Sequence, residues 1–441
     1  MDDIELLLKR AAEMLRQESP RMDRQELVAF VRTFLHRREA FLDINRRHGS
    51  PLYIIDEQAL LDRAGQFGDA FRREIPGIRL FYALKSNHHP AIASRLVGTG
   101  MGLDVSSGVE LTTALAIADA MIIFSGPGKL PSELALAVAH ADRVTVLIDS
   151  FGELARLEQA AGDAGVIIQA GVRLTIDERG LWRKFGIPLA DLERFLTEAA
   201  VCRHVAVKGL QFHSSWNMNP DNQIAFITRV GAALQALPKK KRARISFVDI
   251  GGGYWPMAGE WLQAAGTPEG RLRQMIAPET AATGVSYRYV STPIEIFARR
   301  LGETVKSELL SRVDCTIYTE PGRWLCHDAM HILLTVIDKK GDDLVITDGA
   351  TNAIGWERFE TDYFPVINLS RPDEQERPGL VLGSLCTPHD VWGYGYYGSD
   401  IQPGDVLLIP AQGAYTYSLR QNFIKPLPET VVMPSVRPDG S

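Results

Sequence analysis

A lysine follows a run of residues that reads as a buried β-strand. Residues 81–84 are aromatic or aliphatic, and Lys85 comes directly after them. Burial among apolar neighbours disfavours a charged ammonium, so a lysine in this place is suited to act as an amine nucleophile and to form an imine with a carbonyl group. One lysine is explained equally well as a surface residue at a strand end, so the interpretation depends on residues elsewhere.

Two other predicted strand ends carry groups that suit a phosphate and a ring nitrogen. The strand predicted over 245–250 continues into Gly251, Gly252 and Gly253. Glycines allow backbone N–H groups to close around a phosphate, although a tight turn is an alternative explanation. A second strand ends in Glu320, with Gly322 and Arg323 after it. Together with Lys85, these residues fit an aldehyde cofactor: the arginine and glycines hold its phosphate, and the carboxylate keeps its ring nitrogen protonated.

Two further strand ends are polar. His213 ends the strand predicted over 208–213, and an imidazole there could stack on a flat aromatic cofactor. Asp104 lies in the strand predicted over 102–105 and is equally consistent with a turn former or an N-cap.

The elements that must position these residues alternate short β-rich runs with longer helical ones, which is typical of parallel β/α units. Eight strands are predicted, at 79–85, 102–105, 121–125, 144–149, 167–174, 208–213, 245–250 and 316–320. Eight units predict a (β/α)8 TIM barrel over 51–322, in which the working groups lie at the C-terminal ends of the strands.

The flanking regions differ from this pattern. Residues 1–50 read as two amphipathic helices, the second capped by Asp23, and we expect this extension to pack on the body. Residues 323–441 contain apolar runs separated by turns and predict a C-terminal β domain of sandwich or barrel type.

Composition limits the partners. The 441 residues carry a formal net charge of -6, which argues against a nucleic-acid partner and favours small molecules. Four cysteines without a CxxC pair argue against a disulfide framework or a structural zinc site. The N-terminus lacks the order of a secretory signal, and no apolar run is long enough to cross a membrane, so we expect a cytoplasmic protein.

The combined motifs resemble those of the fold-type III pyridoxal-phosphate decarboxylases, the group of diaminopimelate decarboxylase and eukaryotic ornithine decarboxylase, whose barrel is of the alanine racemase type. The likeness covers about residues 50–425. The family's YAxKxN motif, with its Schiff-base lysine, matches at Lys85, and its GxDxxSxxE motif matches 102–110, which includes Asp104. The stacking histidine matches His213, the glycine loop matches 251–253, and the EPGR motif matches 320–323.

Two more matches lie in the predicted β domain. Residues 383–386 resemble the family segment whose cysteine, here Cys386, reaches into the active site of the partner subunit. Residues 413–416 resemble the segment whose tyrosine, here Tyr415, meets the phosphate. The resemblance implies pyridoxal 5'-phosphate as cofactor, a head-to-tail homodimer with shared active sites, and Cys386 as the candidate proton donor. A small buried apolar residue is the alternative interpretation of that cysteine.

The substrate end departs from the family pattern. The glycine-serine pair usual after the stacking histidine is replaced, which leaves Ser215 as the candidate phosphate contact. Thr387 follows Cys386, where diaminopimelate decarboxylases have glutamate and ornithine decarboxylases have aspartate. An ammonium group at the far end of a substrate requires a carboxylate partner, and threonine is neutral. The predicted substrate-binding residues are Arg323, Arg358, Glu360, Cys386, Thr387 and Tyr415.

We therefore expect decarboxylation of an amino acid other than free diaminopimelate, such as a modified or carrier-linked amino acid of a siderophore or antibiotic pathway. Three alternatives stay open. Diaminopimelate decarboxylation in lysine biosynthesis is one, because Arg358 could bind a distal carboxylate. An amino-acid racemase shares the barrel and the lysine but needs a second base. A homologue that binds the cofactor without turnover is the third.

Overall fold

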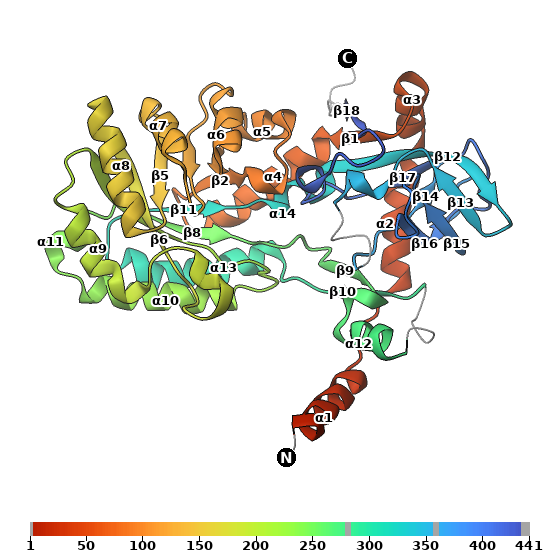
Figure 1. Cartoon of the computed structure of the whole chain (residues 1–441), viewed down its shortest axis with the longest axis horizontal. Coiled ribbons are helices and arrows are strands. Elements are labelled where there is room, and N and C mark those ends of the chain that lie inside the picture. Colours follow the sequence, from red (N-terminus) through yellow and green to blue (C-terminus); the bar gives the residue numbers. More distant parts are fainter. Residues whose placement is uncertain (1–2, 278–283, 356–360, 434–441) are drawn as a thin grey trace. The chain divides into compact units, whose positions relative to one another are not determined.

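The computed structural model describes residues 3–277, 284–355 and 361–433, and Figure 1 shows its elements. The chain divides into two compact units. We call Ala59–Met257 with Ser291–Cys326 the barrel unit, and Met1–Gln58 with Ala258–Val290 and His327–Ser441 the sheet unit.

The barrel unit contains a closed barrel of eight parallel strands, which confirms the predicted fold. The strands are β2 (Arg79–Ala83), β3 (Gly102–Val105), β4 (Ile122–Phe124), β5 (Val144–Ile148), β6 (Ile168–Leu174), β7 (Val205–Phe212), β8 (Phe247–Gly252) and β11 (Thr316–Glu320). The helices are α4 (Glu57–Glu74), α5 (Pro90–Val97), α6 (Gly108–Leu115), α7 (Pro131–Ala139), α8 (Phe151–Ala164), α9 (Leu192–Ala199), α10 (Asp221–Ala236), α11 (Lys239–Arg242), α13 (Ile294–Thr304) and α14 (Arg323–Cys326).

The inside of the barrel contains a layer of apolar side chains, and polar side chains lie at the C-terminal ends of its strands. Phe81, Ile123, Leu147 and Phe247 form a buried cluster against which Tyr318 packs. The rings of Phe247 and Tyr318 stack with centroids 4.7 Å apart. Because these side chains fill the interior, the barrel has no open channel, and the polar residues are left to the C-terminal ends of the strands.

The sheet unit is built on one eight-stranded sheet in the order β13-β15-β16-β14-β17-β12-β1-β18. Its strands are β1 (Leu52–Asp56), β12 (Met330–Lys340), β13 (Leu344–Thr347), β14 (Ile367–Asn368), β15 (Glu376–Leu382), β16 (Val391–Tyr397), β17 (Val406–Ile409) and β18 (Glu429–Met433). The separate β domain expected after the barrel is therefore present, as a sheet.

The units do not follow the predicted domain boundaries of 51 and 322. Strand β1, assigned to the barrel range from the sequence, pairs with β12 and β18 in the sheet unit. All five of its residues are buried, and a short apolar run of this kind fits either type of sheet. Residues 258–290 also leave the barrel and form the hairpin of β9 (Glu260–Gln263) and β10 (Ser286–Tyr289) with helix α12 (Pro268–Ile276).

The N-terminal region contains three helices, where two were expected: α1 (Asp3–Arg16), α2 (Arg24–His36) and α3 (Arg38–His48). Asp23 caps α2 as expected, since its side chain accepts from the backbone N–H groups of Gln25 and Glu26. Residues of α2 and α3, including Val31 and Phe41, are buried in the core of the sheet unit. Helix α1 has no buried residue, but it contacts helix α12 of the same unit. No helix in the described parts of the chain is long and apolar enough to cross a membrane.

Candidate active site

Lys85 lies at the C-terminal end of β2 and forms an ion pair inside the barrel. It follows the strand in a short 3-10 turn, Leu84–Ser86. Its Nζ is 2.5 Å from Oδ2 of Asp104, a buried residue of the neighbouring strand β3. Burial and the nearby Glu320 raise the pKa of Asp104, while Lys85 and a 2.6 Å hydrogen bond from Ser125 oppose that shift. Asp104 is therefore neither a turn former nor an N-cap, and its carboxyl group holds the amine of Lys85 in place.

Glu320 supplies a buried negative charge at the end of β11. Nε2 of Gln211 donates to its Oε1 at 3.1 Å, and Nδ1 of His213 lies 3.4 Å from its Oε2. Burial alone would raise the pKa of Glu320, but the hydrogen bond from His213 and the charges of Lys85 and Arg173 lower the pKa to about 2. An ionised carboxylate in this place can hold a protonated ring nitrogen.

His213 connects Glu320 to the glycine loop. Its Nδ1 is 3.2 Å from the backbone N–H of Gly252 as well as 3.4 Å from Glu320. A deprotonated Nδ1 accepts from Gly252, whereas a protonated Nδ1 donates to Glu320, and one nitrogen cannot do both. Burial lowers the pKa of His213, although Glu320 acts in the opposite direction. If another group donates a hydrogen bond to the carboxylate of Glu320, a neutral His213 can still accept the hydrogen bond from the backbone N–H of Gly252. The position of the imidazole ring is then unchanged.

The glycine loop 251–253 contacts the ends of both neighbouring strands through its backbone. A Cβ atom at Gly252 would lie 2.0 Å from the carbonyl oxygen of Glu320, and one at Gly253 would lie 2.3 Å from that of Ser214. Gly251 and Gly253 also have φ of +71° and +84°, which side chains disfavour. Asn217, which the sequence analysis missed, is buried and donates to the carbonyl oxygens of Gly252 and Ser214 at 2.8 and 3.1 Å.

Arg323 lies over an aromatic ring beside this loop. Its Cζ is 4.2 Å from the ring centroid of Trp255, which is 8% exposed. Trp255 in turn lies 5.9 Å from Trp216, an exposed residue with φ of +55°. Ser215 is half-buried in the segment between His213 and Trp216. The ring of Trp255 thus supports one face of the guanidinium group.

Two more charged residues of the site were missed from the sequence. Asp249 in β8 accepts from the backbone N–H of Gly251 at 2.9 Å. Burial raises the pKa of Asp249 well above its ordinary value, and the nearby charge of Glu320 raises it further. Arg173 in β6 is 7% exposed, with its Cζ 4.6 Å from the ring centroid of Phe185. Both residues come one position before the end of an expected strand, so a wider window at the strand ends would have found them.

The remaining candidates belong to the sheet unit and are described there separately. Cys386 is exposed in the loop between β15 and β16, so it is not a buried apolar residue. Thr387 is half-buried, and its Oγ1 accepts from the backbone N–H of His389 at 3.3 Å. Tyr415 is half-buried with φ of +57°. Arg358 and Glu360 lie outside the described residues.

Asp390 anchors the loop that carries Cys386. One of its carboxylate oxygens accepts from the backbone N–H of Leu385 at 2.7 Å. The other accepts from both the backbone N–H and the hydroxyl of Thr351, each at 2.8 Å. Asp390 is 2% exposed, so both of its oxygens serve the loop itself.

The donor set of the barrel unit fits a flat heteroaromatic aldehyde that bears a phosphate. Lys85 offers the amine, Glu320 the anion for a ring nitrogen, and His213 a ring held by the glycine loop. Arg323 and the backbone of residues 251–253 offer phosphate ligands.

Comparison with known proteins agrees with this chemistry. Residues 65–270 match the family model "Pyridoxal-dependent decarboxylase, pyridoxal binding domain". The chain is 22% identical over 428 residues to the diaminopimelate decarboxylase of Aquifex aeolicus, which covers 93% of this chain and 91% of that protein. It is 23% identical over 407 residues to the L-glutamyl-[BtrI acyl-carrier protein] decarboxylase of Niallia circulans, covering 85% of this chain and 86% of that protein.

A solved structure shares the fold. The diaminopimelate decarboxylase of M. jannaschii in complex with L-lysine superposes with a TM-score of 0.72 at 22% identity, and the match covers 89% of this chain and 88% of that one.

Proposed function

Because the chain belongs to the fold-type III pyridoxal-phosphate-dependent decarboxylases, we propose that it removes the α-carboxylate of an amino acid whose side chain is modified or linked to a carrier. Pyridoxal phosphate, when bound, supplies the electron sink for this reaction. Lys85 is the residue that would hold the cofactor, Glu320 its ring nitrogen, and Arg323 with the glycine loop its phosphate.

The observation that carries the proposal is the loop of Cys386, which offers no free carboxylate among its described residues 383–390. Thr387 is neutral, and both oxygens of Asp390 are used by the backbone and by Thr351. Leaving a buried polar group without a hydrogen-bond partner costs about 1–3 kcal/mol of binding free energy, and leaving a buried ammonium group unpaired costs more. A substrate with a free distal ammonium, such as lysine or ornithine, is therefore disfavoured by this loop.

The chemistry also fixes where a conjugating group can be attached. The α-amine must be free to reach the cofactor held by Lys85, and the α-carboxylate must be free to leave. Only the end of the side chain is left for a thioester or an amide. The decarboxylase of Niallia circulans, whose name gives a glutamyl group on an acyl-carrier protein as its substrate, supports this reading.

Cys386 is the residue we propose to return a proton to the α-carbon. Its side chain is exposed on the loop, and a group that acts outside its own unit must be exposed. We propose that it acts in the active site of the partner subunit of a head-to-tail homodimer. Measuring the mass of the holoenzyme in solution tests the dimer, and a monomer with full activity would contradict the shared site.

The substrate is tested by measuring CO2 release by the holoenzyme. We expect CO2 release from a γ-glutamyl thioester of pantetheine. Its kcat/KM should be at least about 10-fold above that for free glutamate, lysine, ornithine or diaminopimelate, which corresponds to a difference of about 1.4 kcal/mol in transition-state binding. Faster turnover of free diaminopimelate would instead support the function named for the Aquifex aeolicus protein. An enantiomer formed without CO2 would indicate a racemase. Lys85→Ala is the control and should lack both the cofactor absorbance band and turnover.

A further inference from the structure

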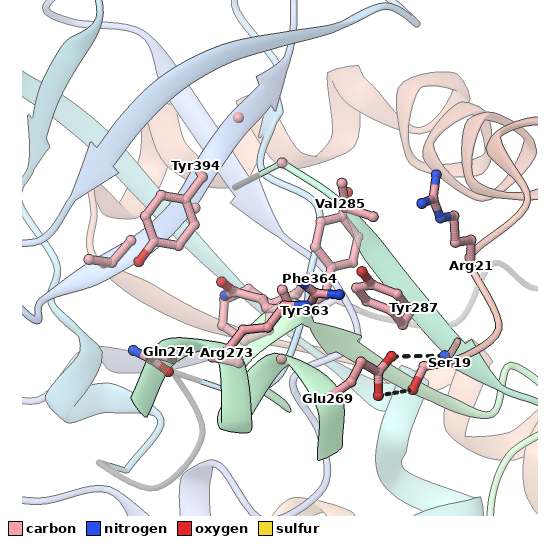
Figure 2. A pocket seen from close by; sticks show the side chains of 18 of the residues that line it. Ser19, Arg21, Glu269, Arg273, Gln274, Val285, Tyr287, Tyr363, Phe364 and Tyr394 are labelled. Atoms are coloured by element: carbon pink, nitrogen blue, oxygen red, sulfur yellow. Dashed lines mark hydrogen bonds between the residues drawn. The ribbon is translucent and has the colours of Figure 1, made fainter. Parts of the chain in front are cut away.

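The sheet unit contains a cavity of about 580 Å³ that the proposed chemistry of the barrel does not use. Stretches far apart in the sequence line it: the end of α1 with the residues that follow it up to Arg21, residues of β9, α12 and β10, Tyr363 with Phe364, Glu376, and the start of β16 with the loop before it. Figure 2 shows Tyr287 of β10 and Tyr394 of β16 on opposite sides of this cavity. Its volume lies within the range of about 300–1,000 Å³ that is typical of small-molecule sites.

Hydrogen bonds between distant segments hold the walls in place. The backbone N–H and the hydroxyl of Ser19 donate to the two carboxylate oxygens of Glu269 at 2.8 and 3.0 Å, as Figure 2 shows. The hydroxyl of Ser19 is also 2.8 Å from that of Tyr289. On the other side, Tyr363 donates to Glu376 at 3.2 Å. The cavity is therefore preformed by contacts within its walls.

The lining combines flat apolar surface with available positive charge. The aromatic side chains are Tyr287, Tyr363, Phe364, Trp392 and Tyr394. Arg16, Arg21 and Arg273 line the cavity too, and no ion pair joins any of them to an acidic side chain in the described parts of the chain. Glu18, Glu269 and Glu376 also line the cavity, so its arginines and glutamates are equal in number; Glu269 accepts from Ser19, and Glu376 accepts from Tyr363. Because no ion pair among the described residues holds the arginines, they are the charged groups that can turn toward the anionic end of a ligand, and the aromatic surface suits its aliphatic body.

The cavity begins beside the loop of Cys386. Pro388 and His389 form part of its wall. Two residues of extended chain span at most about 7 Å, so the Cα atoms of Cys386 and Pro388 are no farther apart than that. The loop that carries Cys386 therefore continues directly into the wall of the cavity.

We propose that the cavity binds the arm of a carrier-linked substrate, a chain of amide and aliphatic groups that ends in a phosphate, as in phosphopantetheine. The inference rests on the proposed function and adds the place where the carrier arm is recognised. The aromatic side chains contact the aliphatic part of the arm, and Arg273 with Arg21 binds its phosphate. Binding of the arm would then supply the substrate specificity that a carboxylate in the Cys386 loop would supply for a substrate with a distal ammonium group.

Calorimetric titration of the holoenzyme tests the site directly. Phosphopantetheine should bind, and Arg273→Glu should weaken its binding at least 10-fold while leaving pantetheine, which lacks the phosphate, within about 2-fold. Val285→Trp should narrow the cavity at its wall and weaken the binding of both at least 10-fold. Arg10→Glu and Val290→Trp make the same exchanges at exposed positions outside the cavity and should change neither. Unchanged binding in Val285→Trp, or inorganic phosphate binding as tightly as phosphopantetheine, would overturn the proposal.

Kinetics separate this inference from the proposed function. We expect Val285→Trp and Arg273→Glu to lower kcat/KM at least 10-fold for the γ-glutamyl phosphopantetheine thioester, with the cofactor absorbance band unchanged. If the thioester is the preferred substrate but both variants turn it over normally, the cavity assignment fails and the proposed function stands. If phosphopantetheine binds in the cavity but the thioester is not decarboxylated, the proposed function fails instead.

Discussion

Lys129 and Glu153 form an ion pair in the interior of the barrel unit, with each side chain 1% exposed. Nζ of Lys129 donates to Glu153 at 2.7 Å and to the carbonyl oxygens of Gly126 and Leu147 at 2.7 and 2.8 Å, so all three ammonium protons are used. Burial lowers the pKa of Lys129 and raises that of Glu153, and the charge of each partner opposes the shift of the other. Each charge is therefore stabilised by its partner in place of water.

Lys129→Met removes one partner and leaves the other buried. Such a loss lowers the free energy of unfolding by about 3–5 kcal/mol. In a unit of this size each kcal/mol shifts Tm by about 2–4 °C, so we expect a decrease of about 6–20 °C.

The deficit of Lys129→Met should depend on pH. Without the lysine, the folded-state pKa of Glu153 lies above its unfolded-state value. A raised pKa contributes stability that is fully present below the unfolded pKa and is lost as the pH rises through the folded pKa. The deficit relative to the unsubstituted protein should therefore shrink as the pH is lowered from about 8 toward 5.

Differential scanning calorimetry over this pH range is the assay. The double variant Lys129→Met/Glu153→Leu removes both charges and should regain most of the lost stability. Lys306→Met is a matched control, because the Lys306 side chain is 52% exposed and 3.7 Å from Glu74; its loss should be about 1 kcal/mol or less. If Lys129→Met melts no lower than Lys306→Met, or if its deficit is the same at every pH, the reasoning is refuted.

Three other variants test the catalytic groups. Cys386→Ala should keep the cofactor absorbance band and lose most CO2 release, and a variant with full turnover would refute the assigned role. Asp249→Asn should leave the dissociation constant of the cofactor, measured by equilibrium dialysis, within about 2-fold, because the raised pKa of this carboxyl group favours its neutral form, which asparagine resembles; a loss above about 10-fold would contradict this reasoning. Trp255→Leu should weaken cofactor binding by about 2- to 30-fold, since a cation–π contact of about 0.5–2 kcal/mol holds Arg323. Trp261→Leu, which changes a tryptophan of the sheet unit whose ring packs against Phe30 and Tyr363, is the control and should have a smaller effect.

Much of the barrel could be predicted because the pattern that identifies each strand lies within a few consecutive residues. Each strand is a short buried run, and the C-terminal ends of parallel strands meet on one face. The proximity of Lys85 and Glu320 could therefore be predicted from the sequence. The same rule extends to Asp249 and Arg173, which lie one residue before the ends of their expected strands and were missed. Burial shifts the pKa of Asp249, and that burial depends on neighbours that the sequence does not name.

The boundaries between the units could not be predicted, for a different physical reason. Strand β1 and the insertion 258–290 are continuous in sequence with the barrel, and neither carries a change of composition. Their partners are distant: Leu52 pairs with Leu333, and the backbone of Met22 donates to that of Ser286. Pairing between residues so far apart leaves no periodic signal in either segment.

This difference bears on substrate choice. The groups that bind the cofactor lie at strand ends and are determined by a fold shared with the M. jannaschii enzyme at a TM-score of 0.72. The cavity instead requires Ser19 to meet Glu269, 250 residues away, and the insertion 258–290 to meet β16, which begins only at Val391. The hydrogen bonds described for Lys85 and Glu320 join them to Asp104 and Gln211, which lie on strands of the barrel. A family with one catalytic chemistry can therefore acquire new substrates through segments outside the barrel, and in this chain the feature to examine for substrate identity is the cavity they form.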